Sequence, residues 1–138
     1  MKITKKRNRY RNYLSLEALV ILLVMGIFRL VPDVKWASVV AGFLFIGSSL
    51  GILYWETRYP DFKKHASFWG VLVFFIFSAL PIFILRLWHW DIAFDQVQFL
   101  GFSGPELHKT SNNIFILMMV CFFADSYLES KREQEQAQ

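Results

Sequence analysis

The chain has only one cysteine, and this scarcity limits the chemistry that the sequence allows. A single thiol cannot form an internal disulfide, and it cannot build a cysteine-based metal site. Cys121 also lies within the apolar run of residues 114–124, where a buried and unreactive thiol is expected. Structural disulfides and cysteine-ligated metals are therefore excluded as explanations of this fold.

The sequence also lacks the motifs of common enzyme and nucleic-acid-binding classes. It holds no phosphate-binding Gly-rich loop and no dinucleotide-binding fingerprint. No spacing fixes a serine, cysteine or paired-carboxylate constellation, so no catalytic residue, metal site or cofactor is predicted. The net charge of +4 does not indicate nucleic acid, because six of the basic residues directly precede an apolar helix.

Charged residues are few, whereas apolar residues are abundant. Charged side chains make up 19% of the chain, against 55% hydrophobic and 18% aromatic residues. This composition leaves too little polar surface for a soluble globule, so a membrane protein is predicted. We expect an all-α fold, a polytopic four-transmembrane-helix bundle in which residues 1–138 form a single membrane domain. The predicted spans cover residues 13–31, 36–55, 68–88 and 105–128, with a surface or re-entrant segment at residues 90–102.

Local signals set the boundaries of these spans. Pro32 interrupts the first apolar run, so the first two spans are expected to form a tight antiparallel pair. Pro81 removes a backbone donor and predicts a kink in the third span, where Ser78 would help to satisfy the opened backbone. Ser103 and Glu106 have the spacing of a capping box, so the fourth helix should begin before its polar first turns.

Both termini are predicted to be cytoplasmic. Eleven Lys and Arg residues lie in the terminal segments and in the connection of residues 56–65, against four on the other side. The predicted location is the cell membrane, as a multi-pass protein of a bacterial inner membrane. Glu17 is expected near the start of the first span, within reach of lipid headgroups. The basic residues expected to contact anionic headgroups are Lys2, Lys5, Lys6, Arg7, Arg9 and Arg11.

The predicted outer side gathers a second set of polar residues. Polar side chains at membrane depth need partners, so they either form a structural network or mark a functional site. In the network, Glu106 and Asp91 would neutralise Arg86 or Arg29; in the alternative, the same residues bind a small ligand, an ion or a proton. The candidate residues are Arg29, Arg86, His89, Asp91, Glu106, His108, Asn112 and Asn113.

The second span carries a possible packing surface. Gly47 and Gly51 have a GxxxG spacing, which permits close helix approach within the bundle or between subunits. The leading hypothesis is a non-enzymatic accessory, assembly or interaction subunit that packs against itself as a homo-oligomer or against another membrane protein. The alternative is an oligomeric transporter or channel with its site in the outer leaflet. A third hypothesis is an integral-membrane enzyme that uses His89, Asp91 and His108, although the sequence favours a protein that is not an enzyme.

Overall fold

The chain folds into a bundle of long helices. The computed structural model describes residues 2–138, with side chains described from Arg9 onward. Helices account for 82% of the residues, which confirms the predicted all-α class. The elements are α1 (Lys2–Leu30), α2 (Val34–Glu56), η1 (Phe62–Lys64), α3 (Ala66–Phe74), η2 (Phe75–Ala79), α4 (Leu80–Trp88), η3 (Phe94–Gln96), β1 (Gln98–Phe99), β2 (Phe102–Ser103) and α5 (Gly104–Gln136).

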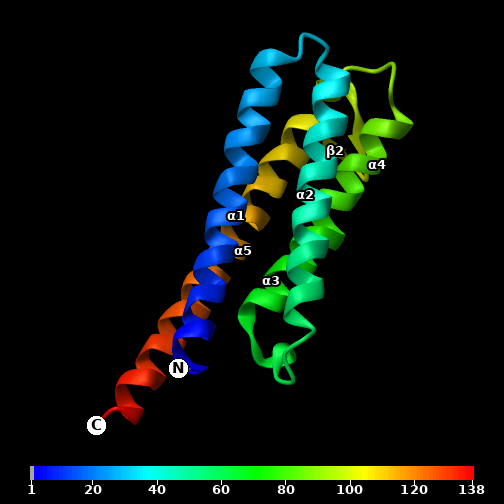
Figure 1. Cartoon of the computed structure of the whole chain (residues 1–138). Helices are drawn as coiled ribbons and strands as arrows, with labels where there is room; N and C mark the ends of the chain where they lie inside the picture. The colour runs from blue at the N-terminus through cyan, green and yellow to red at the C-terminus, as the bar shows by residue number, and fades with distance from the viewer. Residues whose placement is uncertain (1) are drawn as a thin grey trace.

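Four helical stretches are long and apolar enough to cross a membrane, as the sequence predicts. The first helix starts well before the predicted residue 13, and the last continues beyond the predicted residue 128. Figure 1 shows both termini at the same end of the bundle, here called the terminal end. The opposite end carries the α1–α2 turn and the β1–β2 hairpin and is called the hairpin end. The candidate spans are Arg9–Leu30, Val34–Glu56, Ala66–Trp88 and Gly104–Gln136.

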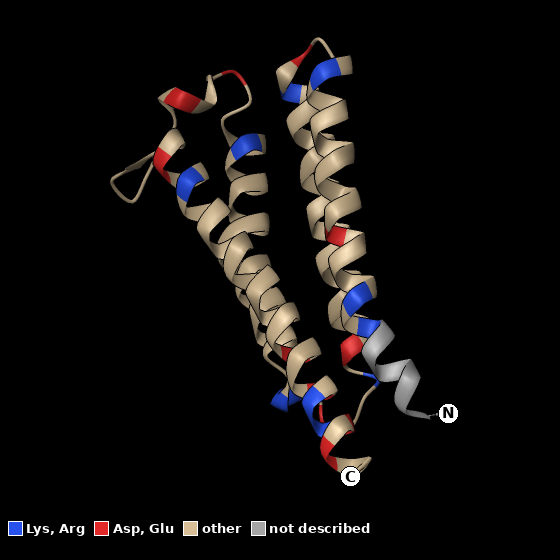
Figure 2. Cartoon of the chain, turned by 90° about the vertical axis from the view of Figure 1, so that its left-hand side faces the viewer, with Lys and Arg blue, Asp and Glu red and all other residues tan. Residues whose placement is uncertain are grey.

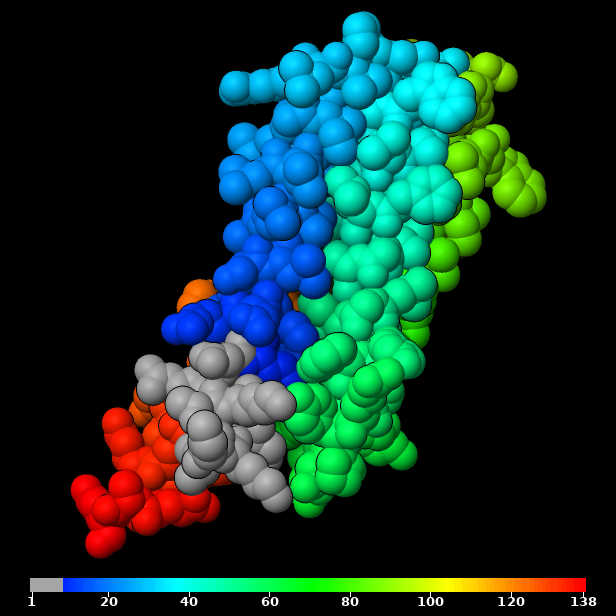
Figure 3. All heavy atoms as spheres, in the orientation of Figure 1, coloured from blue at the N-terminus to red at the C-terminus, as the bar shows by residue number. Residues whose placement is uncertain are grey.

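The α1–α2 turn confirms the break expected at Pro32. Helix α1 ends at Leu30, and α2 begins at Val34 after a three-residue turn. Asp33 caps α2, because its side chain accepts a hydrogen bond of 2.9 Å from the backbone N–H of Lys35. Figure 3 shows α1 and α2 packed against each other along one face of the molecule.

The third span contains a π-helical turn directly before Pro81. In η2, Leu80 donates its backbone N–H to the carbonyl of Phe75, five residues earlier. A proline in the next turn removes one regular donor, so a local change in hydrogen bonding is expected at this point. The proposed role of Ser78 is wrong in detail. Its hydroxyl hydrogen-bonds to the hydroxyl of Ser111 on α5 rather than to the opened backbone of its own helix.

The connection of residues 89–103 is less helical than expected. It holds the short 3-10 turn η3 and then a two-residue antiparallel pairing between β1 and β2. Leu100 and Gly101 form the turn between these strands with φ values of 51° and 83°. Val97 is buried and its carbonyl accepts the N–H of Gly104 at 2.9 Å, so the segment packs onto the start of α5.

The predicted capping box starts α5. The Ser103 side chain accepts the N–H of Glu106, and the Glu106 carboxylate accepts the Ser103 N–H at 2.7 Å. The backbone N–H groups of Ser103 and Glu106 are therefore both satisfied by neighbouring side chains. The polar first turns of α5 are helical, as the sequence predicts.

The helices form two pairs that meet most closely near the terminal end. Figure 2 shows α1 and α2 as one pair and the α3–α4 span with α5 as the other, separating toward the hairpin end. The apolar core lies in the part where the pairs converge. Its members include Tyr13, Ile52, Phe74, Met118 and Phe122.

Close helix packing inside the chain uses other glycines than those expected. A Cβ at Gly70 would lie 3.0 Å from Cys121 Sγ and 3.3 Å from Met118 Cα on α5. A Cβ at Gly42 would overlap the Phe83 ring of α4. A Cβ at Gly47 or Gly51 would meet nothing within 4 Å, so the GxxxG pair does not pack helices within this chain.

We predict that Gly70→Leu destabilises the bundle, because a larger side chain must push α3 away from α5. Overpacking of this kind costs roughly 1–3 kcal/mol. Equilibrium unfolding in mixed detergent micelles measures the change. Gly26→Leu is the matched control, since a Cβ at Gly26 meets nothing within 4 Å. Equal unfolding free energies for the two variants would contradict the close packing at Gly70.

Candidate functional site

The first polar region of the fold is a buried cluster at the terminal end. Its centre is the carboxylate of Glu56, the last residue of α2, whose side chain is fully buried. Tyr13 of α1 donates its hydroxyl to Glu56 Oε1 at 2.7 Å. On the other oxygen, His65 Nδ1 lies 3.1 Å from Glu56 Oε2. The cluster therefore joins α1, α2 and the residue that precedes α3.

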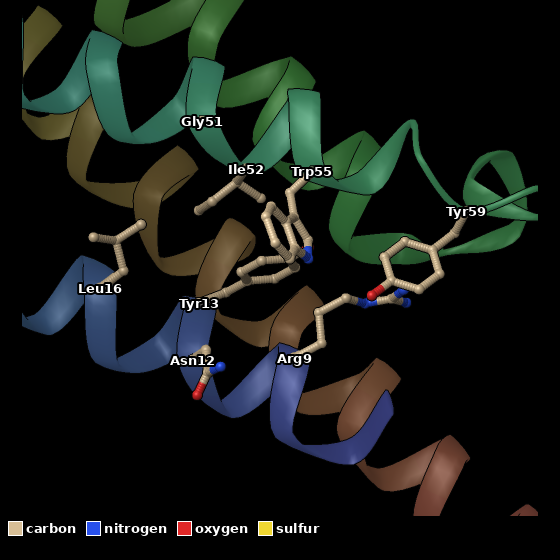
Figure 4. A pocket seen from close by; sticks show the side chains of 8 residues that line it. All are labelled: Arg9, Asn12, Tyr13, Leu16, Gly51, Ile52, Trp55 and Tyr59. Carbon is tan, nitrogen blue, oxygen red and sulfur yellow. The ribbon is translucent and has the colours of Figure 1, made fainter. Parts of the chain in front are cut away.

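Arg9 supplies the positive charge of this cluster. Its Nε lies 3.0 Å from Glu56 Oε1, in charge contact but outside hydrogen-bond geometry. One guanidinium nitrogen donates to the Tyr10 hydroxyl at 2.6 Å, and the group stacks 3.8 Å from the centre of the Tyr59 ring. Figure 4 shows the Arg9 side chain reaching from α1 to Tyr59. A buried Arg9–Glu56 pair with such partners satisfies two charges that would be costly alone.

The predicted lipid contact at Arg9 is wrong, because its side chain is only 3% exposed inside the bundle. Of the other basic N-terminal residues, Arg11 is exposed. The lipid contacts expected of Lys2, Lys5, Lys6 and Arg7 lie outside the described side chains.

A second buried carboxylate, Asp125 of α5, holds the start of α3. It accepts the backbone N–H of Ala66 at 3.2 Å and of Ser67 at 2.6 Å. A carboxylate at this position satisfies free donors of the first turn and interacts favourably with the helix dipole. Together with the Glu56 cluster, it ties all four spans together at the terminal end.

A pocket of about 580 Å³ adjoins this cluster. Figure 4 shows Tyr13 and Asn12 extending from α1 and Trp55 from α2 among the residues that line it. The polar lining groups lie toward the terminal end of the bundle, and the apolar ones lie toward its middle. It is lined by Arg9, Asn12, Tyr13, Leu16, Gly51, Ile52, Trp55 and Tyr59.

Glu17 is not placed as predicted. Because α1 begins at Lys2, the residue lies about four helical turns inside the helix rather than at its start. Its side chain is fully buried, and neither carboxylate oxygen has a hydrogen-bond partner. The hydroxyl of Ser48 lies near the Glu17 carboxylate, but the two groups are not in hydrogen-bond geometry. The Ser48 hydroxyl instead donates to the Phe45 carbonyl at 3.1 Å.

The second polar region lines a cavity of about 580 Å³ toward the hairpin end. Its walls come from α1, α2, η2, α4 and α5, and most of the lining side chains are apolar. The rings of Phe45, Phe74 and Phe115 pack against one another, with centres 5.4 to 6.0 Å apart, and line the cavity where it meets the apolar core. We call these three rings the aromatic floor. The polar lining residues are Ser38, Ser78, Arg86, His108, Ser111 and Asn112.

Arg86 is the charged residue of this lining. It donates a hydrogen bond of 2.8 Å to the Ser38 hydroxyl, and its guanidinium lies 4.8 Å from the centre of the Phe94 ring. Both partners are neutral. The carboxylates expected beside Arg86 are engaged elsewhere: Asp91 lies 3.6 Å from Lys35 Nζ, and Glu106 belongs to the Ser103 capping box.

The other predicted site residues are only partly brought together. His108 and Asn112, one turn apart on α5, both line the cavity with Arg86, whereas Asn113 is exposed and does not line it. Arg29 is exposed in the last turn of α1. His89 Nδ1 lies 3.2 Å from the carbonyl of Leu85. In the described part of the chain, no three His, Cys, Asp or Glu side chains gather to hold a metal ion.

We predict that Glu56→Gln strongly destabilises the protein, because it leaves the buried Arg9 guanidinium without its counter-charge. Breaking one partner of a buried pair costs about 3–5 kcal/mol. The double variant Arg9→Met with Glu56→Gln should lose less than the sum of the single changes. Unfolding in mixed micelles measures this cycle.

The control for this cycle is Lys64→Ala, which breaks the exposed Lys64–Asp61 pair of 3.1 Å. Such surface pairs contribute about 0–1 kcal/mol. Additive losses at Arg9 and Glu56 would show that the two charges are not coupled.

Two polar regions thus lie toward opposite ends of the bundle, with the aromatic floor between them. Four long apolar helices in this arrangement are compatible with a multi-pass integral membrane protein. No protein-family model matches the sequence, and no curated protein or solved structure is significantly similar to the chain.

Proposed function

We propose that the chain is a non-enzymatic membrane protein that binds an anionic amphiphile in its hairpin-end cavity. One observation carries this proposal: a guanidinium lines an apolar cavity while its own partners are neutral. The contacts of Arg86 are the Ser38 hydroxyl and the Phe94 ring. A cation in an apolar setting gains most from an anionic partner, which replaces lost hydration with charge-assisted hydrogen bonds.

The size and lining of the cavity fit such a ligand. Ligand sites in proteins are typically about 300–1,000 Å³, mostly apolar, with a few polar groups that fix orientation. Here the apolar wall includes Ile21, Met25 and Phe28 of α1, suited to an acyl chain. His108 and Asn112 add hydrogen-bonding groups to the lining that also holds Arg86. The ligand class is therefore an acyl chain with a phosphate or carboxylate headgroup.

The aromatic floor favours binding over an open channel. Phe45, Phe74 and Phe115 line the cavity where it meets the apolar core, and the packed core continues from them toward the terminal end. A pathway across the membrane would require these rings to separate. The transporter hypothesis shares this site, but a transport path would have to pass through these packed rings.

The orientation that we propose follows from charge. The terminal end would face the cytoplasm, because the excess of Lys and Arg lies there. The cavity would then lie in the outer leaflet of the membrane, which we propose to be a bacterial inner membrane.

We predict that Arg86→Gln weakens binding of phosphatidylglycerol. A hydrogen bond to a charged group contributes about 1.5–3 kcal/mol, so the Kd should rise roughly tenfold or more. Native mass spectrometry of the purified protein, titrated with phosphatidylglycerol or with phosphatidylcholine, measures both affinities. The wild-type protein should prefer the anionic lipid.

Arg29→Gln is the matched control, because Arg29 is an exposed arginine near the same end of the bundle and does not line the cavity. It should bind phosphatidylglycerol as the wild type does. Equal losses in the two variants would mean that the lipid contacts a diffuse surface charge, and equal affinity for both lipids would refute anion recognition at Arg86.

A second candidate function is the assembly role, in which the chain packs against itself or another membrane protein. The supporting observation is that Gly47 and Gly51 lie on α2 with open space beside them and serve no helix contact within the chain. Small residues at this spacing allow a second helix to approach closely in lipid. The exposed neighbours Phe43, Leu50 and Tyr54 would flank such a contact.

We predict that Gly47→Leu reduces self-association if α2 forms this contact, because the added side chain holds a neighbouring helix away. Crosslinking in vesicles at several protein-to-lipid ratios measures the dimer fraction. Gly26→Leu is the control on a different helix. A strictly monomeric wild-type protein would exclude the homo-oligomer, and an unchanged dimer fraction would place its interface elsewhere.

A further inference from the structure

Glu17 differs from the other two carboxylates buried in the described chain. Glu56 has Arg9, Tyr13 and His65 around it, and Asp125 accepts two backbone N–H groups. Glu17 is equally buried, yet both of its oxygens are without a hydrogen-bond partner. An ionised carboxylate in such a place is very costly, because nothing replaces its lost hydration.

Helix α2 presents a neutral hydroxyl group to Glu17. Ser48 of α2 lies near the carboxylate, and the adjacent Ser49 is fully buried with its hydroxyl likewise unpartnered. A protonated carboxyl has one O–H donor, and a serine oxygen can accept it. A proton therefore removes the charge and provides the missing hydrogen bond with groups already present.

A metal cation fits this place less well than a proton. Hard cations such as Ca²⁺ take about 6–8 oxygen ligands. Glu17, Ser48 and Ser49 supply at most four side-chain oxygens, one of which already donates its proton to the Phe45 carbonyl. The small number of oxygens favours the smallest cation, the proton.

The position of Glu17 gives it two routes of approach. The terminal-end pocket is lined by Tyr13 and Leu16, within one turn of Glu17 on α1. The hairpin-end cavity begins at Ile21, one turn in the other direction. On α2, Ser48 and Ser49 likewise lie between Ile52 of the pocket and Phe45 of the aromatic floor. Glu17 therefore sits in the short barrier that separates the two spaces.

We infer that Glu17 is a reversible proton-binding site inside the membrane, at the boundary between the terminal-end pocket and the hairpin-end cavity. One carboxylate oxygen takes a proton from water at an adjoining space and later returns it to water, with no electron transfer and no co-reactant. The inference is independent of ligand binding at Arg86, since it rests on a different residue and a different set of contacts.

The charged and titratable groups on the elements packed against α1 leave this site undisturbed. Toward the terminal end these groups include Tyr13 on α1 itself, Glu56 at the end of α2, and Asp125 with Cys121 on α5. Toward the hairpin end they are Arg29 on α1, Lys35 on α2, and Glu106, His108 and Lys109 on α5. The nearest buried cation, Arg9, is paired with Glu56. Both Glu17 oxygens are without a hydrogen-bond partner among the described residues, so none of these groups compensates the charge of Glu17 in its ionised form.

The test is infrared spectroscopy of the protein in vesicles of neutral lipid as the pH is stepped in both directions. The wild type should show the C=O stretch of a carboxylic acid at neutral pH, where exposed carboxyls are ionised. This band should be lost reversibly at alkaline pH and be absent in Glu17→Gln. Glu106→Gln is the control, because that carboxylate belongs to the exposed capping box and should leave the band unchanged.

Several outcomes would overturn the inference. A spectrum in which no acid band depends on Glu17 at neutral pH would show that the group is ionised, and a band that persists at the highest pH at which circular dichroism shows a folded protein would show that the proton does not exchange. Gln has the size of Glu and no charge, so the variant should fold. If it does not, glutamate with a ¹³C-labelled carboxyl is incorporated into the wild type and into Glu17→Asp. The acid band must shift with the isotope in the wild type and lose that shift in Glu17→Asp.

Discussion

The carboxylate of Glu56 is the contact on which the arrangement of the helices most depends. Buried at the end of α2, it must be surrounded by donors, because a bare carboxylate in an apolar interior is prohibitively costly. Its partners come from elsewhere in the sequence: the Arg9 charge and the Tyr13 hydroxyl on α1, and the His65 ring before α3. Asp125 does the same for α5 and the start of α3. These polar contacts hold the four spans together at the terminal end.

The position of these polar contacts explains why the helix pairs lie closer together at the terminal end than at the hairpin end. Toward the hairpin end, α2 and α4 stay in contact through Phe43 with Phe83 and through Ser38 with Arg86. The α1–α2 pair nevertheless separates from the other pair, as Figure 2 shows. The space between them is the cavity that holds Arg86. A closely packed terminal end and a more open hairpin end are therefore two results of one distribution of polar contacts.

Much of the fold could be predicted because its signals are local. The break at Pro32, the irregular turn before Pro81 and the capping box at Ser103 each depend on a few neighbouring residues. The terminal-end cluster was missed because Glu56 has no local sign of its partners. One signal was available: Arg9, Tyr13 and Glu17 recur every four residues and so share one helix face. Their burial depended on where α1 begins and on the helices it meets. At the hairpin end, Lys35 and Ser103 engage the carboxylates that were expected beside Arg86.

The π-helical turn η2 has a consequence for the chemistry of the cavity. A π turn accommodates one additional residue, and each residue of an α-helix advances the side chains by about 100° around its axis. The side chains after Ala79 therefore lag by about 100° around the helix axis, compared with a regular α-helix of the same residues. In a regular helix, the direction now taken by Arg86 would belong to Leu85, and Arg86 would point in the exposed direction now taken by Leu87. The π turn therefore shifts the phase of the helix, so that Arg86 points toward the cavity and Leu87 points outward.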